Sequence, residues 1–486
     1  MSWIVLVLSG LLGLLLAVWG TRLIASLVPE GFASSVHDLN TIGLDWSIFG
    51  FTLALSLLTG VVFGIVPALT GSRPNLLRAL REGGERNVMS FGLRSMRGWL
   101  VVTELALALI LLLGAGLLVR SFTQLTAVDL GFDRENVLTA RVSLPRSVYR
   151  TPSQTASFYE QLFERLKSLP GVTSAGAISH TPLSGFSMIV AFTQIEGHPP
   201  VDRDTGAPIG IGVVSPDYFR TMKIPLLSGR VYEERDKADS AKVAIVNQSF
   251  VRRYFPNADA LGKRVSFGCE EDLCRTIVGV VGNVKQESIT ADVTPEMYLP
   301  FSQMPRNGMT LFLRTSGGNP ADLARAVRSE VLTIDKNQPI YDVKTLDHRV
   351  VETITASRSL MFLFSGFALL AMVLAVVGIY GIISYSVSQR TREIGIRMAL
   401  GARAVDVLRM VLKSGMTLVL AGIAIGVAGA LALTRFLATL LFGVTPTDTF
   451  TFVVVSIVLI AVALIACLVP ARRATKVNPL EALTYE

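Results

Sequence analysis

Long stretches without charged residues constrain the fold of this chain more than any other feature. At 1.5 Å per helical residue, each of the five stretches given below is long enough to cross the ~30 Å hydrocarbon core of a bilayer. A sixth, Trp99–Val119, is interrupted only by Glu104, which we interpret as an interfacial anchor. Buried helices of a soluble protein would give apolar runs of only about 10–14 residues. We therefore expect six membrane spans, five of them uncharged: Met1–Thr21, Trp46–Ser72, Ser359–Gln389, Ser414–Thr434 and Phe450–Ala471.

The composition supports a membrane protein and excludes two other classes. Only 17% of the residues are charged, whereas soluble proteins carry about 25%, and the mean hydropathy is +0.52. A disordered chain and a purely cytosolic enzyme are therefore excluded. The net charge of +8 indicates basic loops at a membrane surface rather than binding to nucleic acid. The first stretch lacks a basic leader and exceeds a usual signal-peptide core, so we interpret it as a retained span.

The distribution of Lys and Arg predicts the orientation. Both are concentrated in Gly71–Gly98, Ser388–Lys413 and Arg472–Glu486, and both are absent from the short loops Pro29–Asp45 and Ala438–Thr449. The positive-inside rule therefore places both termini in the cytoplasm. The long segment between the third and fourth spans then lies outside, and it carries 26 basic and 26 acidic residues. The arginines that break the rule sit at span ends, where long side chains reach the interface: Arg22, Arg120, Arg358 and Arg435.

The exterior segment has the pattern of an α+β domain. Residues Val137–Leu144 alternate as in a strand, Ser157–Leu169 has helical spacing, and Val172–Ile178 again has the pattern of a strand. The order recurs near the end, where Asn319 is expected to cap a helix that starts with Pro320. The two β-α-β units flank an insertion, roughly Ser215–Tyr298. Its strand-like stretches predict a β-rich lobe: Val243–Val246, Arg264–Phe267 and Ile277–Val281.

Two cysteines, Cys269 and Cys274, bracket an acidic stretch in this exterior segment. Thiols oxidise outside the cytoplasm, and a gap of this size can close a small hairpin, so a disulfide is expected. Two free thiols are the alternative. A metal site is not expected, because no other ligands of the right type lie nearby.

Parts of the membrane segment occur twice. Ile65–Ala68 matches Leu468–Ala471, with Pro-Ala at the exit of each helix, and Asn75–Leu80 matches Asn478–Leu483 at the same offset. The last two spans of one unit are thus repeated, which indicates two tandem units with the front of the first one missing. Small residues at Gly60-x₃-Gly64 and Gly422-x₃-Gly426 are expected to allow close helix packing.

A short amphipathic helix is expected on the cytoplasmic side between the fourth and fifth spans. Glu393 and Arg397 stand four residues apart on one helical face, with Ile394 and Met398 on the next. Gly401 permits a C-cap and a turn into a helix beginning near Val405. A basic loop that only sets topology would have a similar composition.

These residues carry a family resemblance. The segment Gln389–Ala402, QRTREIGIRMALGA, and the ending from Pro470 to Leu483 resemble the FtsX-like permease domain of ABC transporters of the macrolide-exporter (MacB) type. The exterior segment is similar to the periplasmic core domain of that family, in fragments such as Val214–Phe219 and Ile277–Val281. The tandem layout resembles the duplicated orphan permease subgroup.

The resemblance implies an α-helical integral membrane protein of the bacterial inner membrane, with six spans and a MacB-like periplasmic core domain. In such a protein a cytoplasmic ABC ATPase dimer grips the helix near residues 388–403, and ATP hydrolysis moves the spans and the outer domain. Catalytic residues, metals and cofactors are not expected in the chain itself, because ATP binds the separate ATPase. The gripping residues would be Arg390, Arg392, Glu393, Arg397, Gly401 and Ala402.

The expected domains follow from these readings. They are residues 1–72 (two spans of a truncated first unit), 73–98 (basic linker), 99–120 (third span), 121–357 (periplasmic core domain) and 358–486 (FtsX-like permease domain). Two ATPases need two docking helices and this sequence has one, so we expect either a longer reading frame or assembly of two chains.

Export is the leading function that the resemblance implies. In the alternative, the same machine is a relay that does not transport, and it controls an envelope enzyme or receptor through a periplasmic partner. An enzyme is disfavoured because the sequence has no G-x-x-x-x-G-K-[ST], H-E-x-x-H or G-x-S-x-G motif.

Overall fold

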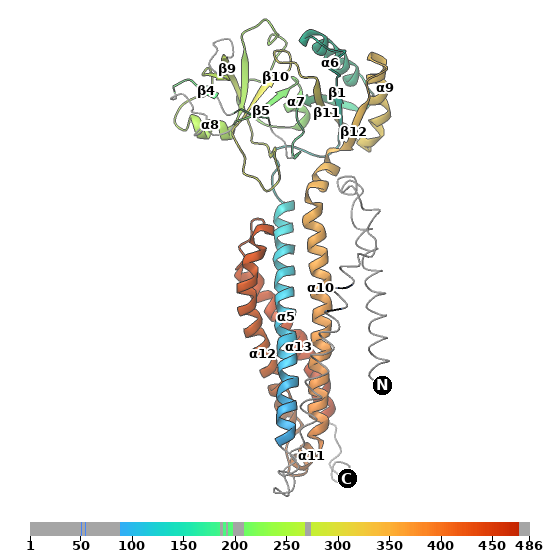
Figure 1. The fold of residues 1–486 in the computed structure, drawn as a ribbon, viewed down its shortest axis with the longest axis vertical. Coiled ribbons are helices and arrows are strands. Elements are labelled where there is room, and N and C mark those ends of the chain that lie inside the picture. The colour runs from blue at the N-terminus through green and yellow to red at the C-terminus, as the bar shows by residue number, and fades with distance from the viewer. Residues whose placement is uncertain are drawn as a thin grey trace. The chain divides into compact units, whose positions relative to one another are not determined.

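The computed structural model describes residues 88–184, 188–190, 193–197, 209–267 and 274–475, together with Gly50 and Ala54. The chain divides into two compact units. One consists of Ala127–Thr355, and the other comprises the chain up to Thr126 and from Ala356 onward. We call them the head unit and the helical unit, and we describe each by itself (Figure 1).

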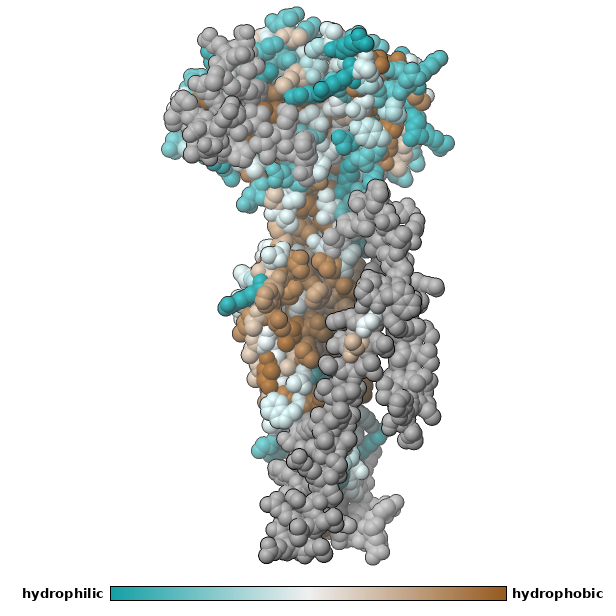
Figure 2. All heavy atoms as spheres, viewed as in Figure 1, coloured by the Kyte–Doolittle hydropathy of each residue, from teal (hydrophilic) through white to brown (hydrophobic). Residues whose placement is uncertain are grey.

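The helical unit contains long apolar helices. Among the described residues, four are long and apolar enough to span a membrane: Gly98–Thr126, Ser357–Gln389, Ala404–Leu440 and Thr449–Ala474. They belong to α5 (Val88–Thr126), α10 (Leu346–Gln389), α12 (Ala404–Leu437, followed by the 3₁₀ turn η4, Ala438–Leu440) and α13 (Thr449–Ala474). The first two expected spans lie outside the described residues, apart from Gly50 and Ala54. Where grey atoms do not hide these helices in Figure 2, brown, hydrophobic residues make up much of the visible surface.

Glycines allow α12 to pack closely on α5. A Cβ built on Gly422 would lie 2.7 Å from Cβ of Leu105, and one on Gly426 would lie 2.9 Å from Cδ2 of Leu109. Real Cβ atoms essentially never come this close, so a larger residue at either position would require its neighbours to shift. The close packing predicted for Gly422-x₃-Gly426 is therefore confirmed, whereas Gly60-x₃-Gly64 lies outside the described residues.

The described residues of the head unit form one twelve-stranded sheet in the order β12-β1-β11-β2-β5-β10-β7-β9-β8-β4, with β3 on β5 and β6 on β9. In chain order its elements are β1 (Val137–Ser143), α6 (Pro152–Lys167), β2 (Val172–Ile178), β3 (Met188–Val190), β4 (Thr193–Ile195), β5 (Ile209–Val214), α7 (Tyr218–Met222), β6 (Leu226–Gly229), β7 (Val243–Asn247), α8 (Gln248–Tyr254), β8 (Arg264–Phe267), β9 (Cys274–Val281), β10 (Glu296–Pro300), β11 (Gly308–Thr315), η3 (Pro320–Leu323), α9 (Ala324–Ile334) and β12 (Ile340–Thr345).

The two predicted β-α-β units are confirmed as β1-α6-β2 and β11-α9-β12. Their strands interleave in the order β12-β1-β11-β2, with antiparallel neighbours, which is the arrangement of a split β-α-β fold. The inserted residues extend the same sheet, and β2 is joined to β5 through the single pair Ile178↔Val214.

Helix α6 starts earlier than the expected Ser157. Thr151 caps it in a capping box with Gln154, and Pro152 occupies the first turn, so its start is fixed by local chemistry rather than by hydrophobic spacing. Asn319 accepts a hydrogen bond from the N–H of Ala321, as expected of a cap, but it caps the 3₁₀ turn η3 rather than α9 itself.

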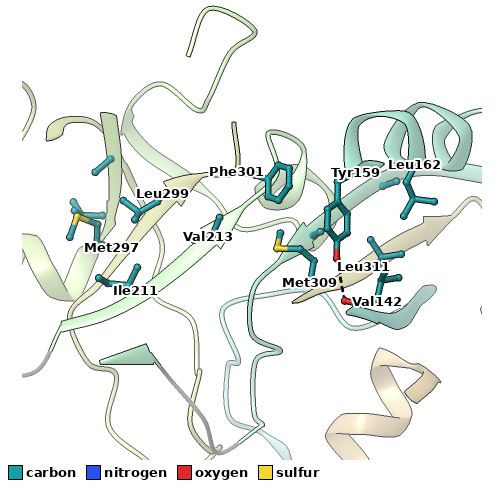
Figure 3. Close-up of a cluster of buried hydrophobic side chains, with 14 of the residues drawn as sticks. Val142, Tyr159, Leu162, Ile211, Val213, Met297, Leu299, Phe301, Met309 and Leu311 are labelled. Carbon is teal, nitrogen blue, oxygen red and sulfur yellow. Dashed lines mark hydrogen bonds between the residues drawn. The ribbon is translucent and has the colours of Figure 1, made fainter. Parts of the chain in front are cut away.

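One buried hydrophobic cluster of the head unit lies where α6 packs on the sheet. Tyr159 of α6 is fully buried there, and its hydroxyl reaches backbone carbonyls of Val142 (3.2 Å) and Asn307 (2.9 Å) (Figure 3). Its ring packs edge-on against Phe301 with centroids 5.2 Å apart. A buried tyrosine with a satisfied hydroxyl fixes the helix against β1 without leaving an unpaired polar group in the core.

Candidate functional site

The predicted surface helix is present between two membrane-span candidates. Helix α11 (Thr391–Ala399) lies between the end of α10 at Gln389 and the start of α12 at Ala404. Its first turn carries Glu393 and its last turn carries Arg397. An acid near the N-terminus and a base near the C-terminus both complement the helix dipole.

The turn after α11 has the hydrogen bonds of a Schellman motif. Gly401 adopts a left-handed φ of +97°, its N–H donates to the Met398 carbonyl (3.1 Å), and the Ala402 N–H donates to the Arg397 carbonyl (3.0 Å). Arg403 then donates its backbone N–H to the side chain of Asp406 (3.1 Å) at the start of α12. The predicted turn at Gly401 is thus confirmed, and it needs glycine because L side chains rarely adopt this φ.

The inner face of α11 packs on the neighbouring helices. Ile394 is buried and belongs to the apolar core of the helical unit, and Met398 packs against that core. A small cavity of about 20 Å³ lies beside Ile394 and the half-buried Arg390, with lining residues from α10 and α12. Such a space holds about one water molecule, so it is no ligand site. The inner face therefore anchors α11 to the helices before and after it.

The outer face of α11 and the turn after it are exposed and partly apolar. Glu393 and Arg397 form an ion pair of 2.7 Å with both side chains 47% exposed. Beside them Leu400 is 83% exposed, Val405 is 65% exposed, and Ile396 is also exposed. We call these five residues the α11 surface. An exposed i,i+4 pair stabilises a helix by only about 0.3–0.5 kcal/mol, so its charges remain available to a partner.

The apolar members of the α11 surface are not among the residues predicted from the sequence. Leu400 directly precedes Gly401 and Val405 stands at the start of α12, both within the basic segment Ser388–Lys413. That context was the signal available in the sequence. Arg392 lies within α11, but its side chain is outside the described set.

The structure describes the predicted cysteine pair only in part. Cys274 begins β9, and Cys269 lies outside the described residues, so the disulfide stays a prediction. Within the described part of the chain, no group of three or more His, Cys, Asp or Glu side chains is placed to hold a metal ion. The α11 surface presents one exposed ion pair and three exposed apolar side chains.

Two family models match this chain. Residues 365–479 match the FtsX-like permease C-terminal model, and residues 100–330 match the MacB-like periplasmic core domain model. The chain belongs to the FtsX-like and MacB-like permeases. In this permease the first match contains α11 and α12 entire, and the second extends from α5 into α9.

Curated relatives of this permease are export proteins by name. The macrolide export ATP-binding/permease protein MacB of Chromobacterium violaceum is 29% identical over 290 residues, 57% of this chain and 43% of that protein. The probable syringafactin export ATP-binding/permease protein SyfD of Pseudomonas syringae is 28% identical over 318 residues, 63% of this chain and 45% of that protein. The chain thus spans less than half the length of either relative.

A solved structure matches part of the permease. The periplasmic region of MacB from Actinobacillus actinomycetemcomitans aligns with a TM-score of 0.32 and 16% identity, covering 46% of this chain and 94% of that one.

Proposed function

We propose that this permease is the membrane subunit of an ABC-type export complex, in which a separate cytoplasmic ATPase docks on the α11 surface. Closure of the ATPase dimer on ATP would displace α11, and the spans and the periplasmic domain would move in response. The relatives are named as joined ATP-binding and permease proteins, whereas the printed sequence has no P-loop motif. In this proposal ATP binds the ATPase that docks on the α11 surface.

The exposure of the α11 surface is the observation that carries this proposal. The largely exposed side chain of Leu400 adds almost no buried apolar area to the fold, so it contributes little to the free energy of folding. It lies beside an ion pair that also contributes little to stability. An apolar centre with adjacent charges is typical of a protein interface. Anchoring of the inner face through Ile394 would let a push on α11 reach α10 and α12.

The test reverses the charge pair. In the double variant Glu393→Lys/Arg397→Glu the two side chains can still pair within the helix, although the new order opposes the dipole and is slightly less favourable. The fold should therefore persist while complementarity to the ATPase is lost. We expect normal membrane levels of the permease and loss of ATPase co-purification from the native host.

A matched control reverses an exposed ion pair elsewhere. Arg165 and Glu330 pair at 3.3 Å in the head unit, and Arg165→Glu/Glu330→Arg should leave ATPase co-purification unchanged. Undiminished co-purification by the α11 double variant would mean that the helix serves only topology. Macrolides are the first cargo to test, by efflux from cells with and without the permease, because the relatives' names specify them.

A further inference from the structure

The last strand of the head unit passes into α10 without a connecting residue. Strand β12 ends at Thr345 and α10 begins at Leu346. The Thr345 hydroxyl accepts a hydrogen bond from the N–H of His348 (3.2 Å), so the strand's last residue also caps the helix. A strand that becomes a helix in one step leaves no loop to absorb a rotation between them.

The start of α10 is also held by apolar packing. Leu346, Val350 and Ile354 are all buried and stand four residues apart, so they form one stripe on the first turns of the helix. All three residues belong to the head unit, so the first turns of α10 are part of that unit.

A β-bulge deforms β12 just before the helix. In the pairing with β1, Thr139 faces Lys344 and Arg141 faces Tyr341. Asp342 and Val343 therefore stand together opposite one residue of β1. Asp342 has a left-handed φ of +52°, a conformation that bulges usually give to glycine. Strain kept at a non-glycine residue is a reason to look for a function of its side chain.

Arg349 of α10 donates hydrogen bonds both to the bulge in β12 and to the neighbouring strand β1. Its Nη1 donates to Oδ2 of Asp342 (2.8 Å), its Nη2 to the carbonyl of Asp342 (2.6 Å), and its Nε to Oγ1 of Thr139 (2.6 Å). The Thr139 hydroxyl donates in turn to the Lys344 carbonyl (2.7 Å), so its oxygen is correctly placed to accept. Arg349 is only 14% exposed. We call Arg349, Asp342 and Thr139 the α10 clamp.

The other helix that enters the head unit is connected differently. Ten residues, 127–136, separate the end of α5 from the start of β1. Arg314 of β11 donates to the carbonyls of Glu135 (2.8 Å) and Asp133 (2.7 Å) in that loop. The Asp133 N–H also donates to the Met222 carbonyl (3.0 Å), and the Leu130 carbonyl accepts from the N–H of Lys285 (3.1 Å). The loop is thus held from Leu130 onward, it pairs with α10 through Arg134 and Asp347 (3.2 Å), and residues 127–129 lie between α5 and the first of these contacts.

We propose that Arg349 is a positioning residue that makes α10, rather than α5, the element through which movement enters the periplasmic sheet. The forked guanidinium joins the first turn of α10 to β12 and β1 at once, so the helix cannot swivel without moving both strands. This inference rests on the proposed function, since it names the path by which ATPase-driven movement would reach the domain.

The first arm of the test needs no ATPase. Hydrogen exchange of the full-length permease in nanodiscs should show amides of residues 340–352 exchanging about tenfold faster in Arg349→Ala, with β11 unchanged. Arg349→Lys should restore part of the protection, because one ammonium can still reach Asp342. Arg358→Ala is the matched control: Arg358 lies on the same helix, with its guanidinium 5.6 Å from the Phe362 ring, outside the clamp. Unchanged exchange at 340–352 in Arg349→Ala would overturn the clamp.

The second arm separates transmission from mere anchoring. The ATPase that co-purifies with the wild-type permease is added, and exchange in β1 and β12 is compared with ADP and with ATP plus vanadate. We expect a nucleotide-dependent change in the wild type and in Arg358→Ala, and its loss in Arg349→Ala at equal ATPase binding. An equal change in Arg349→Ala would overturn this inference alone. If the wild type shows no change, the proposed function fails, and this inference fails with it.

Discussion

Arg120, near the C-terminal end of α5, forms an ion pair with Asp448, the N-cap residue of α13. Asp448 also accepts hydrogen bonds from the backbone N–H (2.9 Å) and the hydroxyl (2.6 Å) of Thr451. Those bonds from Thr451 and the charge of Arg120 lower the pKa of Asp448. Arg120 was one of the arginines that break the positive-inside rule. Its pairing with Asp448, in the loop that precedes α13, compensates the charge of Arg120 and links α5 to α13.

Two variants of Asp448 should separate its cap from its charge. Asp448→Asn keeps an oxygen for the Thr451 N–H but removes the ion pair, and we expect a loss of at most about 1 kcal/mol. Asp448→Ala removes the cap as well, which costs about 1 kcal/mol more. Thermal unfolding of the detergent-purified permease, followed by helical circular dichroism, should rank wild type above Asn and Asn above Ala. Equal melting temperatures for the two variants would show that the cap contributes nothing.

The glycine contacts between α5 and α12 give a second prediction. A Cβ on Gly422 would also lie 3.2 Å from the backbone carbonyl of Val102, which cannot move aside as a flexible side chain would. Gly422→Ala should therefore separate the helices and cost about 1–3 kcal/mol. Gly366 of α10 has no described atom within 4 Å of a built Cβ, so Gly366→Ala should be neutral or stabilise by up to about 1 kcal/mol. Thermal unfolding of both variants tests the contrast, and equal destabilisation would contradict it.

Local chemistry explains what the sequence predicted well. Both β-α-β units, the turn at Gly401 and the close packing at Gly422 follow from spacing, capping or residue size within short stretches. The capping box at Thr151 is equally local, whereas the hydrophobic spacing begins only near Ser157 and therefore misses the first turn of α6. Such features need no knowledge of distant partners.

Contacts between distant residues explain what could not be predicted. Arg349 meets Thr139 across 210 positions, and the bulge that turns Asp342 toward it depends on the register between β12 and β1. Nothing local in the sequence fixes that register. Arg120 and Asp448 are likewise separated by 328 positions. In α11 the sequence predicted the charge pair, but exposure of Leu400 depends on how the turn leaves the helix.

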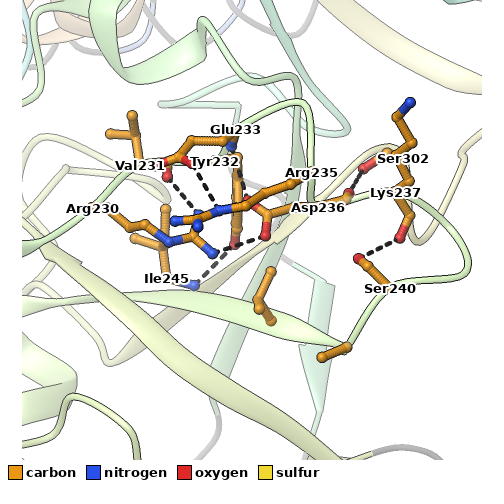
Figure 4. Close-up of polar contacts among 12 residues, drawn as sticks. Arg230, Val231, Tyr232, Glu233, Arg235, Asp236, Lys237, Ser240, Ile245 and Ser302 are labelled. Carbon is orange, nitrogen blue, oxygen red and sulfur yellow. Dashed lines mark hydrogen bonds and ion pairs between the residues drawn. The ribbon is translucent and has the colours of Figure 1, made fainter.

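Acid should weaken the head unit through Asp236. Arg230 grips both oxygens of this carboxylate (2.7 and 2.9 Å), and the N–H of Glu233 donates to it as well (Figure 4). Burial opposes ionisation, but these hydrogen bonds outweigh it and lower the pKa of Asp236. The unfolded chain therefore binds the proton more readily. The stabilisation is complete above the ordinary carboxyl pKa of about 3.9 and is lost as the pH falls through the lower value of the folded state.

Asp236→Ala tests this pH dependence. Removing one partner of a largely buried pair should cost about 3 kcal/mol at pH 7, and the gap to the wild type should narrow below pH 4. Thermal unfolding of the full-length permease at several pH values measures the gap through the β-sheet signal. Glu233→Gln is a suitable control, because the hydrogen bonds between Glu233 and Asp236 use only the backbone N–H and carbonyl of Glu233. A gap that stayed constant down to pH 3 would mean that Asp236 contributes through packing alone.

Leu400 should matter for binding the ATPase and not for folding. Because its side chain is largely exposed, Leu400→Glu should change the free energy of unfolding by less than about 0.5 kcal/mol. An apolar anchor at the centre of an interface is worth about 1–2 kcal/mol or more, so the ATPase affinity should fall by about tenfold or further. Val148→Glu makes the same change at an exposed site of the head unit and should leave the affinity unchanged. Titration of the co-purifying ATPase onto nanodisc-bound permease provides the dissociation constants. If Leu400→Glu binds as tightly as Val148→Glu, the ATPase does not contact the apolar part of the α11 surface, whatever the charge reversal at Glu393 and Arg397 shows.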